Sequence, residues 1–306
     1  VVVDPPVTGS ITGSIDWVTV GDPGNTADTT TYGAVADSFQ IMKFEFQNSQ
    51  YADFLNAVDP SGTNPNAVYN ANMGSNARGG ISFTSGAASG SKYAIRTNMG
   101  DKPVNYVSWF DAARVANWLQ NGQGSGSTET GAYTLVGGQT SGTAPAANPG
   151  ASYFLPTEDQ WYKAAYYKGS GTNAGYWDYA TQSDLAPTAV TADSTGIGSA
   201  GLSSTDNSAN FNSAADWNSL NGNVTTVGSN GGASAYGAFD MSGNIFEWND
   251  RTGAAGSSRG LRGGGWYNLA FDLSSSARLT SGSYEDNGVG FRLASPVAVP
   301  EPSTYL

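Results

Sequence analysis

The chain is rich in residues that interrupt regular secondary structure. Of its 306 residues, 41 are glycine and 13 are proline, and asparagine, serine and threonine are also plentiful. Glycine adopts backbone conformations that other residues avoid, so such a composition predicts many tight loops. Hydrophobic residues still make up 39% of the sequence, which excludes a disordered chain. We therefore expect a packed core that is connected mainly by loops.

Only a few segments show a clear hydrophobic period. Strands are predicted where residues alternate, at 15–20, 37–47, 79–85 and 92–97. Helical spacing predicts helices at 48–58, 103–123 and 155–167. Asn48 or Ser49 is the expected N-cap of the first helix, and Ser108 with Asp111 forms a capping box in the second. A small hairpin is expected at 131–138.

The chain divides into one large domain with two arms. Residues 1–14 form an extended N-terminal arm, residues 15–295 the domain, and residues 296–306 a proline-rich tail. Within the domain, 169–235 is a long glycine- and serine-rich excursion, and such loops usually bind something or are pinned. The first residues, "VVVDPPVTGS", are typical of a start left by signal-peptide removal. No stretch reaches eighteen apolar residues, so no membrane span is expected.

The ionisable residues exclude several kinds of site. The net charge is −12, which disfavours a nucleic-acid partner because phosphate binding needs a basic surface. The chain has no cysteine and no histidine. This excludes thiol nucleophiles, disulfides, zinc or iron held by these residues, and imidazole catalysis. Any bound metal must have oxygen ligands, which indicates calcium.

Six segments together carry a family resemblance. They are "KFEFQNSQYADFLNAV", "KPVNYVSWFDAARVANWL", "LPTEDQWYKAAYY", "YGAFDMSGNIFEWND", "LRGGGW" and "GFRLA". From about residue 15 to 294 the chain resembles the formylglycine-generating-enzyme-like (sulfatase-modifying factor) domain. The resemblance implies an α+β fold, namely an irregular, loop-rich variant of the C-type-lectin fold. The tail "VPEPSTYL" resembles a PEP-CTERM sorting signal, which implies a secreted protein of a bacterial cell surface or extracellular matrix.

The chemistry of that family does not carry over to this chain. Its enzymes hold copper with two cysteines, whose positions fall here near Asn268 and Leu273, and related enzymes hold iron with histidines. Without these ligands we expect no enzyme activity. A carboxylate-based hydrolase is a weaker alternative, because no paired spacing nominates an acid and a base among Glu158, Asp159, Asp178 and Asp272.

The resemblance also implies calcium sites. In the family, the segment through "GNIFEW" wraps calcium, and the matching ligands are the Asp240 and Glu247 carboxylates with the Gly243 and Ile245 carbonyls. A second set comprises Asn210, the Phe211 carbonyl and Asp216. The alternative for the first set is that Glu247 pairs with Arg262 or Arg292, while Asp240 caps a turn.

Arginine and aromatic residues have structural interpretations. Arg262, Arg278 and Arg292 are expected to neutralise carboxylates and to bind loop carbonyls. The tryptophans expected in the core are Trp109, Trp118, Trp161, Trp248 and Trp266. A second aromatic group either packs in the core or lines an exposed patch suited to a sugar or a protein, namely Tyr166, Tyr167, Tyr176, Trp177 and Tyr179.

Two roles remain open for a chain of this kind. The first is a non-catalytic surface or matrix protein that is stabilised by calcium and self-assembles through its arms. "VVVDPPV" would then pair with the sheet edge of another copy, giving a homopolymer. The alternative is a monomeric, lectin-like module that binds a glycan or a peptide. For the first role, the arm must pair with a neighbour rather than fold back on its own domain.

Overall fold

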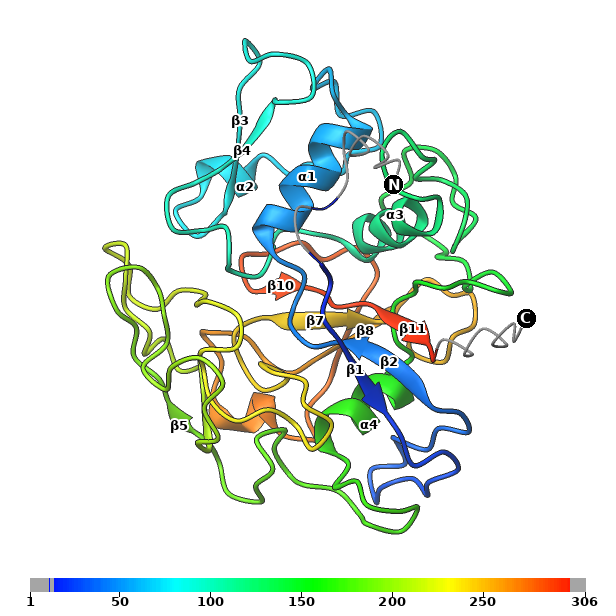
Figure 1. The fold of residues 1–306 in the computed structure, drawn as a ribbon, viewed down its shortest axis with the longest axis vertical. Coiled ribbons are helices and arrows are strands. Elements are labelled where there is room, and N and C mark those ends of the chain that lie inside the picture. Colours follow the sequence, from blue (N-terminus) through cyan, green and yellow to red (C-terminus); the bar gives the residue numbers. More distant parts are fainter. Residues whose placement is uncertain (1–10, 12–13, 298–306) are drawn as a thin grey trace, which may run out of the picture.

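The structure, a computed structural model, describes residue 11 and residues 14–297 of the chain. Two small sheets cross its centre (Figure 1). The first has strand order β1-β2-β11, formed by Trp17–Val20, Phe39–Met42 and Ala294–Pro296. The second has order β10-β7-β8-β9, formed by Val289–Gly290, Phe246–Asn249, Arg259–Arg262 and Leu279–Ser281. Strands from the start and the end of the domain are thus hydrogen-bonded neighbours in the first sheet.

Three helices flank these sheets. Helices α1 (Asn48–Val58) and α3 (Trp109–Gln120) lie on one side of the central strands, and α4 (Glu158–Tyr166) lies on the other (Figure 1). The remaining elements are short: α2 (Asn72–Ser75), the 3₁₀ helix η1 (Ala270–Leu273), and two strand pairs. The pairs are β3 (Ile81–Phe83) with β4 (Tyr93–Ile95), and β5 (Thr188–Ala189) with β6 (Ser208–Ala209).

The helix starts follow the capping rules in two of three cases. At α3, the Asp111 N–H donates to Ser108 Oγ at 3.2 Å and Ser108 N–H donates to Asp111 Oδ2 at 2.8 Å, which confirms the capping box. The predicted cap of α1 was wrong, because the N-cap is Gln47. The Asn48 side chain instead donates to the Met99 carbonyl at 2.9 Å.

The expected hairpin at 131–138 contains no strand. The segment is held by α3 instead: the Asn117 Oδ1 accepts a hydrogen bond of 2.6 Å from the Tyr133 N–H. In a hairpin, the backbone N–H and C=O groups of each strand bond to the other strand. Here the buried Asn117 side chain takes the place of a strand as partner of one backbone N–H.

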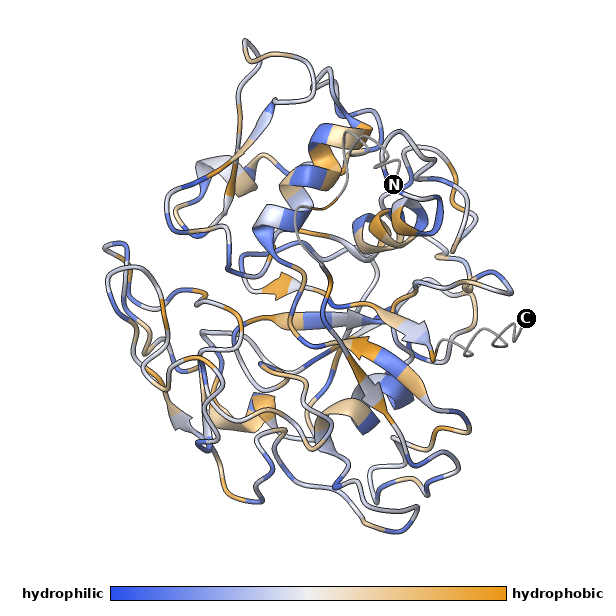
Figure 2. Ribbon diagram, viewed as in Figure 1, coloured by the Kyte–Doolittle hydropathy of each residue, from blue (hydrophilic) through white to orange (hydrophobic). Residues whose placement is uncertain are grey.

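Two apolar cores lie on opposite sides of the central strands. The larger packs α1 and α3 against β7 and contains Trp109, Trp118 and Trp248. The second packs α4 against β1 and β2 and contains Trp161. Figure 2 shows hydrophobic residues on the central strands and in bands on α1 and α3. Each of the five tryptophans expected in the core is at most 6% exposed, so that prediction is confirmed.

Both predicted arms lie largely outside the described residues. Residues 1–10 and 298–306 are not described, whereas Ile11 packs against the larger core and its N–H donates to Gln123 Oε1 at 2.7 Å. Within the part of the chain that the structure covers, no helix is long and apolar enough to cross a membrane.

Candidate functional site

The positions near which the family resemblance places the copper ligands hold neither a thiol nor an imidazole. Asn268 Oδ1 accepts a hydrogen bond of 3.0 Å from the Gly265 N–H, and Asn268 Nδ2 donates to Asp272 Oδ2 at 3.2 Å. Leu273 is fully buried and packs with Ala209 and Phe211. An amide engaged in a turn and an aliphatic side chain do not fit copper, which prefers thiolate or imidazole.

The carboxylate of Glu247 lies at the centre of the structure and is tightly paired. Arg292 donates to both of its oxygens, from Nη2 at 2.6 Å and from Nε at 2.7 Å, and Trp161 Nε1 donates to Oε2 at 2.8 Å. Of the two partners considered from the sequence, Arg292 is therefore the one observed. A carboxylate offers about four lone-pair positions, so one acceptor position remains.

Two further buried carboxylates, those of Asp240 and Glu45, interact electrostatically with the Glu247–Arg292 ion pair. Asp240 accepts hydrogen bonds from the Gly228 N–H and from Asn230 Nδ2, the latter at 2.9 Å. Glu45 is fully buried and accepts from Asn244 Nδ2 at 2.8 Å, while its Oε1 has no partner among the described residues. Burial raises the pKa of Glu45 well above its usual value, and the charges of Asp240 and Glu247 add to the effect. Burial also raises the pKa of Asp240.

These four side chains have an unbalanced charge. Three carboxylates face one guanidinium, so the fully ionised cluster carries two more negative charges than positive ones. Buried charge of this kind is costly unless protons or a cation compensate it. The donors are all oxygen atoms, which suits calcium. No group of three acidic side chains in the described residues is close enough to form a complete metal shell, so an ion here needs backbone carbonyls as well.

The second expected calcium set is more scattered. The Asn210 side chain is fully buried, and its Oδ1 has no hydrogen-bond partner among the described residues. Its Nδ2 donates to the Asn223 carbonyl at 2.8 Å. Asp216 is exposed, and its Oδ1 accepts from the Gly222 N–H at 2.8 Å. The orphaned Asn210 oxygen is therefore the feature of this set that fits a cation.

The predicted roles of the three arginines are confirmed. Arg262 Nη2 pairs with Glu158 at 2.8 Å and its Nη1 donates to the Ser275 carbonyl at 3.0 Å. Arg278 donates to both oxygens of Glu158, at 2.8 and 2.7 Å. Arg292 also binds the Phe239 carbonyl at 2.8 Å. All three neutralise carboxylates, and Arg262 and Arg292 also bind loop carbonyls.

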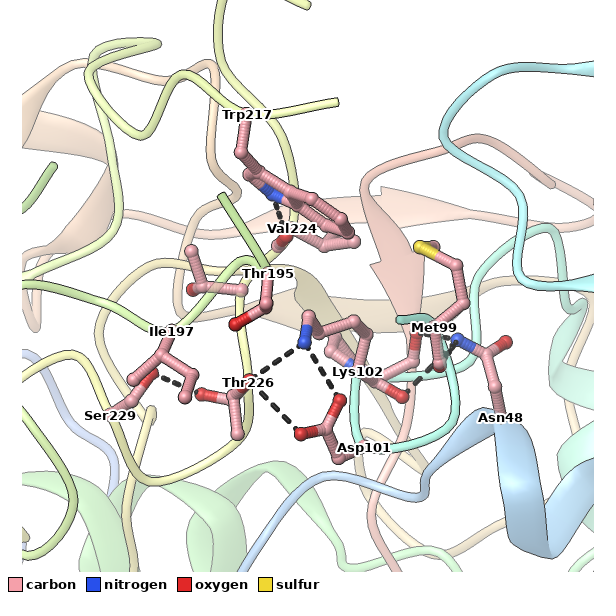
Figure 3. Close-up of polar contacts among 12 residues, drawn as sticks. Asn48, Met99, Asp101, Lys102, Thr195, Ile197, Trp217, Val224, Thr226 and Ser229 are labelled. Atoms are coloured by element: carbon pink, nitrogen blue, oxygen red, sulfur yellow. Dashed lines mark hydrogen bonds and ion pairs between the residues drawn. The ribbon is translucent and has the colours of Figure 1, made fainter. Parts of the chain in front are cut away.

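A buried lysine joins the long excursion to the first half of the chain, and the sequence offered no signal for it. Lys102 is 1% exposed, and its Nζ lies 2.7 Å from both Asp101 Oδ1 and Thr226 Oγ1 (Figure 3). The ammonium also lies 5.2 Å from the centre of the Trp217 ring. Through these contacts the ammonium anchors Thr226 of the excursion to Asp101.

The second aromatic group divides between core and surface. Tyr166 and Tyr167 are fully buried, as core packing predicts. The other three, Tyr176, Trp177 and Tyr179, are half-buried and line a cleft of about 480 Å³. Core packing is thus confirmed for two of the residues, and the other three line a cleft at the surface. The cleft volume lies within the range of small-ligand sites, about 300–1,000 Å³.

Two exposed apolar side chains also line this cleft. Leu185 is 75% exposed and Phe271 is 68% exposed. Phe271 belongs to η1 and also lines a neighbouring hollow of about 270 Å³ together with Leu279. The cleft therefore lies beside the segment that contains Asn268 and Leu273.

Polar groups complete the lining of the cleft. They are the hydroxyl residues Thr29, Thr30, Ser274, Ser275 and Ser276 and the carboxylates of Asp28, Asp178 and Asp184. Several are fixed from behind: Asp28 accepts a hydrogen bond from the Tyr162 hydroxyl, and the Tyr176 hydroxyl donates to the Thr26 carbonyl at 2.8 Å. Rings held in place beside hydroxyls and carboxylates can stack on a ligand and hydrogen-bond to it at the same time.

Comparison with known proteins gives the family. The chain matches the family model described as "Sulfatase-modifying factor enzyme 1-like domain" over residues 18–297. No curated protein sequence gives a significant match. CarF is similar in structure, with a TM-score of 0.55 and 22% identity over 93% of this chain and 99% of CarF.

Two other solved structures have weaker similarity. Treponema denticola variable protein 1 has a TM-score of 0.49 and 18% identity, over 92% of this chain and 95% of that protein. PvdO from Pseudomonas aeruginosa has a TM-score of 0.45 and 17% identity, over 92% of each chain. The fold is the expected irregular, loop-rich, C-type-lectin-like α+β fold. The chain belongs to the sulfatase-modifying factor enzyme 1-like family.

Proposed function

We propose that this protein is a non-catalytic member of its family that binds a glycan or a peptide in the aromatic cleft. The observation that carries the proposal is the cleft itself, which is lined by Tyr176, Trp177 and Tyr179 together with the exposed Phe271 and Leu185. Large exposed apolar side chains beside fixed rings are typical of recognition sites. We also propose that the protein is exported to a bacterial cell surface or matrix, because its tail resembles a PEP-CTERM sorting signal.

The non-catalytic part of the proposal is supported by the residues at the family's copper positions, Asn268 and Leu273. Incubation with copper, oxygen and a cysteine-containing sulfatase peptide should leave the cysteine unchanged. Conversion above a protein-free control would contradict this part alone.

Binding is tested on immobilised glycan and peptide arrays with the intact chain and the variant Phe271→Ser. Because Phe271 is 68% exposed, the variant should fold normally yet lose most of its binding. Val136→Ser, at a side chain that is 71% exposed and does not line the cleft, is the matched control and should bind as the intact chain does. Equal binding by both variants, or none by the intact chain, would reject the cleft as the site.

We propose further that calcium stabilises the fold. The ligands would be Asp240, Glu247 and the Gly243 and Ile245 carbonyls, with Asn210, Phe211 and Asp216 as the second set. Support comes from the excess negative charge around Glu45 and from the unpartnered Asn210 oxygen. Bound calcium would compensate that charge and hold the surrounding loops together.

Self-assembly through the N-terminal arm is a second candidate role, and one observation favours it. Strand β1 is an edge of its sheet, because β2 is its only neighbour among the described residues. The Lys43 N–H donates to the Asp16 carbonyl, and in an antiparallel pair this places the peptide groups of Trp17 and Thr19 away from β2. Such an edge can accept a strand from another copy.

A further inference from the structure

The rim of the aromatic cleft already holds an ammonium group from the chain itself. Lys168 Nζ lies 4.1 Å from the centre of the Trp177 ring and 4.0 Å from Asp184 Oδ2. Both charged side chains are partly exposed, at 32% and 56%. An ammonium is stabilised when it lies over an indole face and beside a carboxylate. The ammonium of a bound ligand can occupy the same position. This pair therefore shows what the rim of the cleft can recognise.

The charged residues that line the cleft are acidic, and Lys168 lies at its rim. Three aspartates line it, and none of its described lining residues is lysine or arginine. The Asp178 carboxylate is exposed, and the Asp178 N–H donates to Asp184 Oδ1 at 3.1 Å, which places the backbone of one residue beside the side chain of the other. The net charge of −12 on the whole chain adds to the negative potential of the cleft. Electrostatic complementarity thus selects a cationic ligand over a neutral or anionic one.

We propose that the cleft binds an oligosaccharide of amino sugars with free amino groups. One ammonium takes the position over Trp177 beside Asp184, which Lys168 otherwise fills. This inference rests on the proposed binding function and names its ligand class.

An amino sugar fits the lining better than a cationic peptide does. Its ring has an apolar face for the aromatic side chains, hydroxyls for the exposed Thr29 and Ser276, and an ammonium for the aspartates. Lysine side chains provide the ammonium but have no ring whose apolar face can stack on the aromatic side chains.

The test is titration calorimetry of the intact chain with three probes. They are a hexamer of β-1,4-linked glucosamine, its fully N-acetylated counterpart, and hexalysine, at a pH where the amino groups are protonated. We expect the glucosamine hexamer to bind about tenfold more tightly than the acetylated one. We expect hexalysine to bind more weakly than the glucosamine hexamer.

Variants locate the binding. Trp177→Leu should reduce affinity for the glucosamine hexamer about tenfold, and Phe83→Leu on β3 should leave it unchanged. Lys168→Met should increase affinity severalfold, because it removes the competing ammonium, whereas the distant Lys92→Met should have no effect. Circular dichroism and melting curves verify that each variant is folded.

The outcomes separate the ligand class from the function. Equal binding of the two sugars overturns the amino-sugar proposal and leaves a glycan-binding module. Tighter binding of hexalysine assigns the cleft to cationic peptides and overturns the proposal. Loss of affinity in Lys168→Met overturns it too, because lysine would then be part of the site. If none of the probes binds and no array ligand does, the proposed function fails as well.

Discussion

At the scale of single residues, buried polar side chains replace regular secondary structure as partners of the backbone. Asn48 donates to the Met99 and Lys102 carbonyls, and Arg292 donates to the Phe239 carbonyl while pairing with Glu247. Buried backbone groups need partners, and a chain with few strands must supply them from side chains. This explains why so many asparagines and arginines of the sequence are found inside.

The buried carboxyl group of Asp111 should make the stability of the fold depend on pH. It is 2% exposed, and burial raises its pKa from 3.8 to about 7, with the charge of Glu285 adding to the effect and Ser108 and Arg114 opposing it. The folded state therefore holds this proton more tightly than the unfolded state does. The stabilisation is complete below the unfolded pKa and is lost as pH rises from about 4 to about 7.

The measurement is urea unfolding of the intact chain and Asp111→Asn at pH 4.5 and pH 8. Asparagine keeps the acceptor for the Ser108 N–H but cannot ionise. The variant should gain stability relative to the intact chain by a few kcal/mol between the two pH values, since one pKa unit corresponds to about 1.4 kcal/mol.

Asp193→Asn is a control, because the pKa of Asp193 is shifted in the opposite direction. Hydrogen bonds from the Ile197 and Thr195 backbone lower the pKa of Asp193, so its contribution is present at neutral pH and is lost only as pH falls through its folded pKa. A difference between Asp111→Asn and the intact chain that does not change with pH would contradict the expectation.

At the scale of elements, most strands are too short to be stable alone. β5, β6 and β10 have two residues each, and β3 has three. Side chains hold the loops between them, for example where Lys102 ties Thr226 of the excursion to Asp101. Strand β1 differs, because one of its edges has no strand partner among the described residues.

The edge of β1 gives the test of assembly. Deleting residues 1–10 retains Ile11, which bonds to Gln123, and should leave a folded monomer. Thr19→Pro should also prevent assembly, because it removes an N–H that points away from β2, and proline is tolerated at sheet edges. Light scattering after size-exclusion chromatography measures both. Polymers from the truncated chain, or a monomeric full-length chain at high concentration with calcium, would refute arm exchange.

At the scale of the whole molecule, two cores meet across the central strands, and the Glu45, Asp240, Glu247 and Arg292 cluster lies between them. Trp161 links the second core to this cluster through its bond to Glu247. A change in the charge of the cluster should therefore affect the stability of the entire domain rather than that of one loop.

Calcium removal tests this expectation. Chelation should lower the melting temperature of protein purified with calcium, because a ligand that binds only the folded state stabilises it by about 2.7 kcal/mol at a hundredfold excess over Kd. Asp240→Asn should reduce the effect, whereas Asp193→Asn, on an exposed turn, should not. An identical melting curve with and without chelator, and no heat of calcium binding, would contradict calcium stabilisation.

The family and fold class, the three main helices, the buried tryptophans and the carboxylate partners of three arginines were predictable from the amino-acid sequence. These follow from local signals, such as periodicity, the Ser108–Asp111 cap and ordered motifs, which act over short distances along the chain. The tertiary structure decided which partner Glu247 takes, that Glu45 joins its cluster, and that Lys102 anchors the excursion. It also separated Tyr166 and Tyr167 in the core from Trp177 at the cleft. These outcomes depend on contacts between residues far apart in sequence, where burial and charge act through space and leave no local pattern.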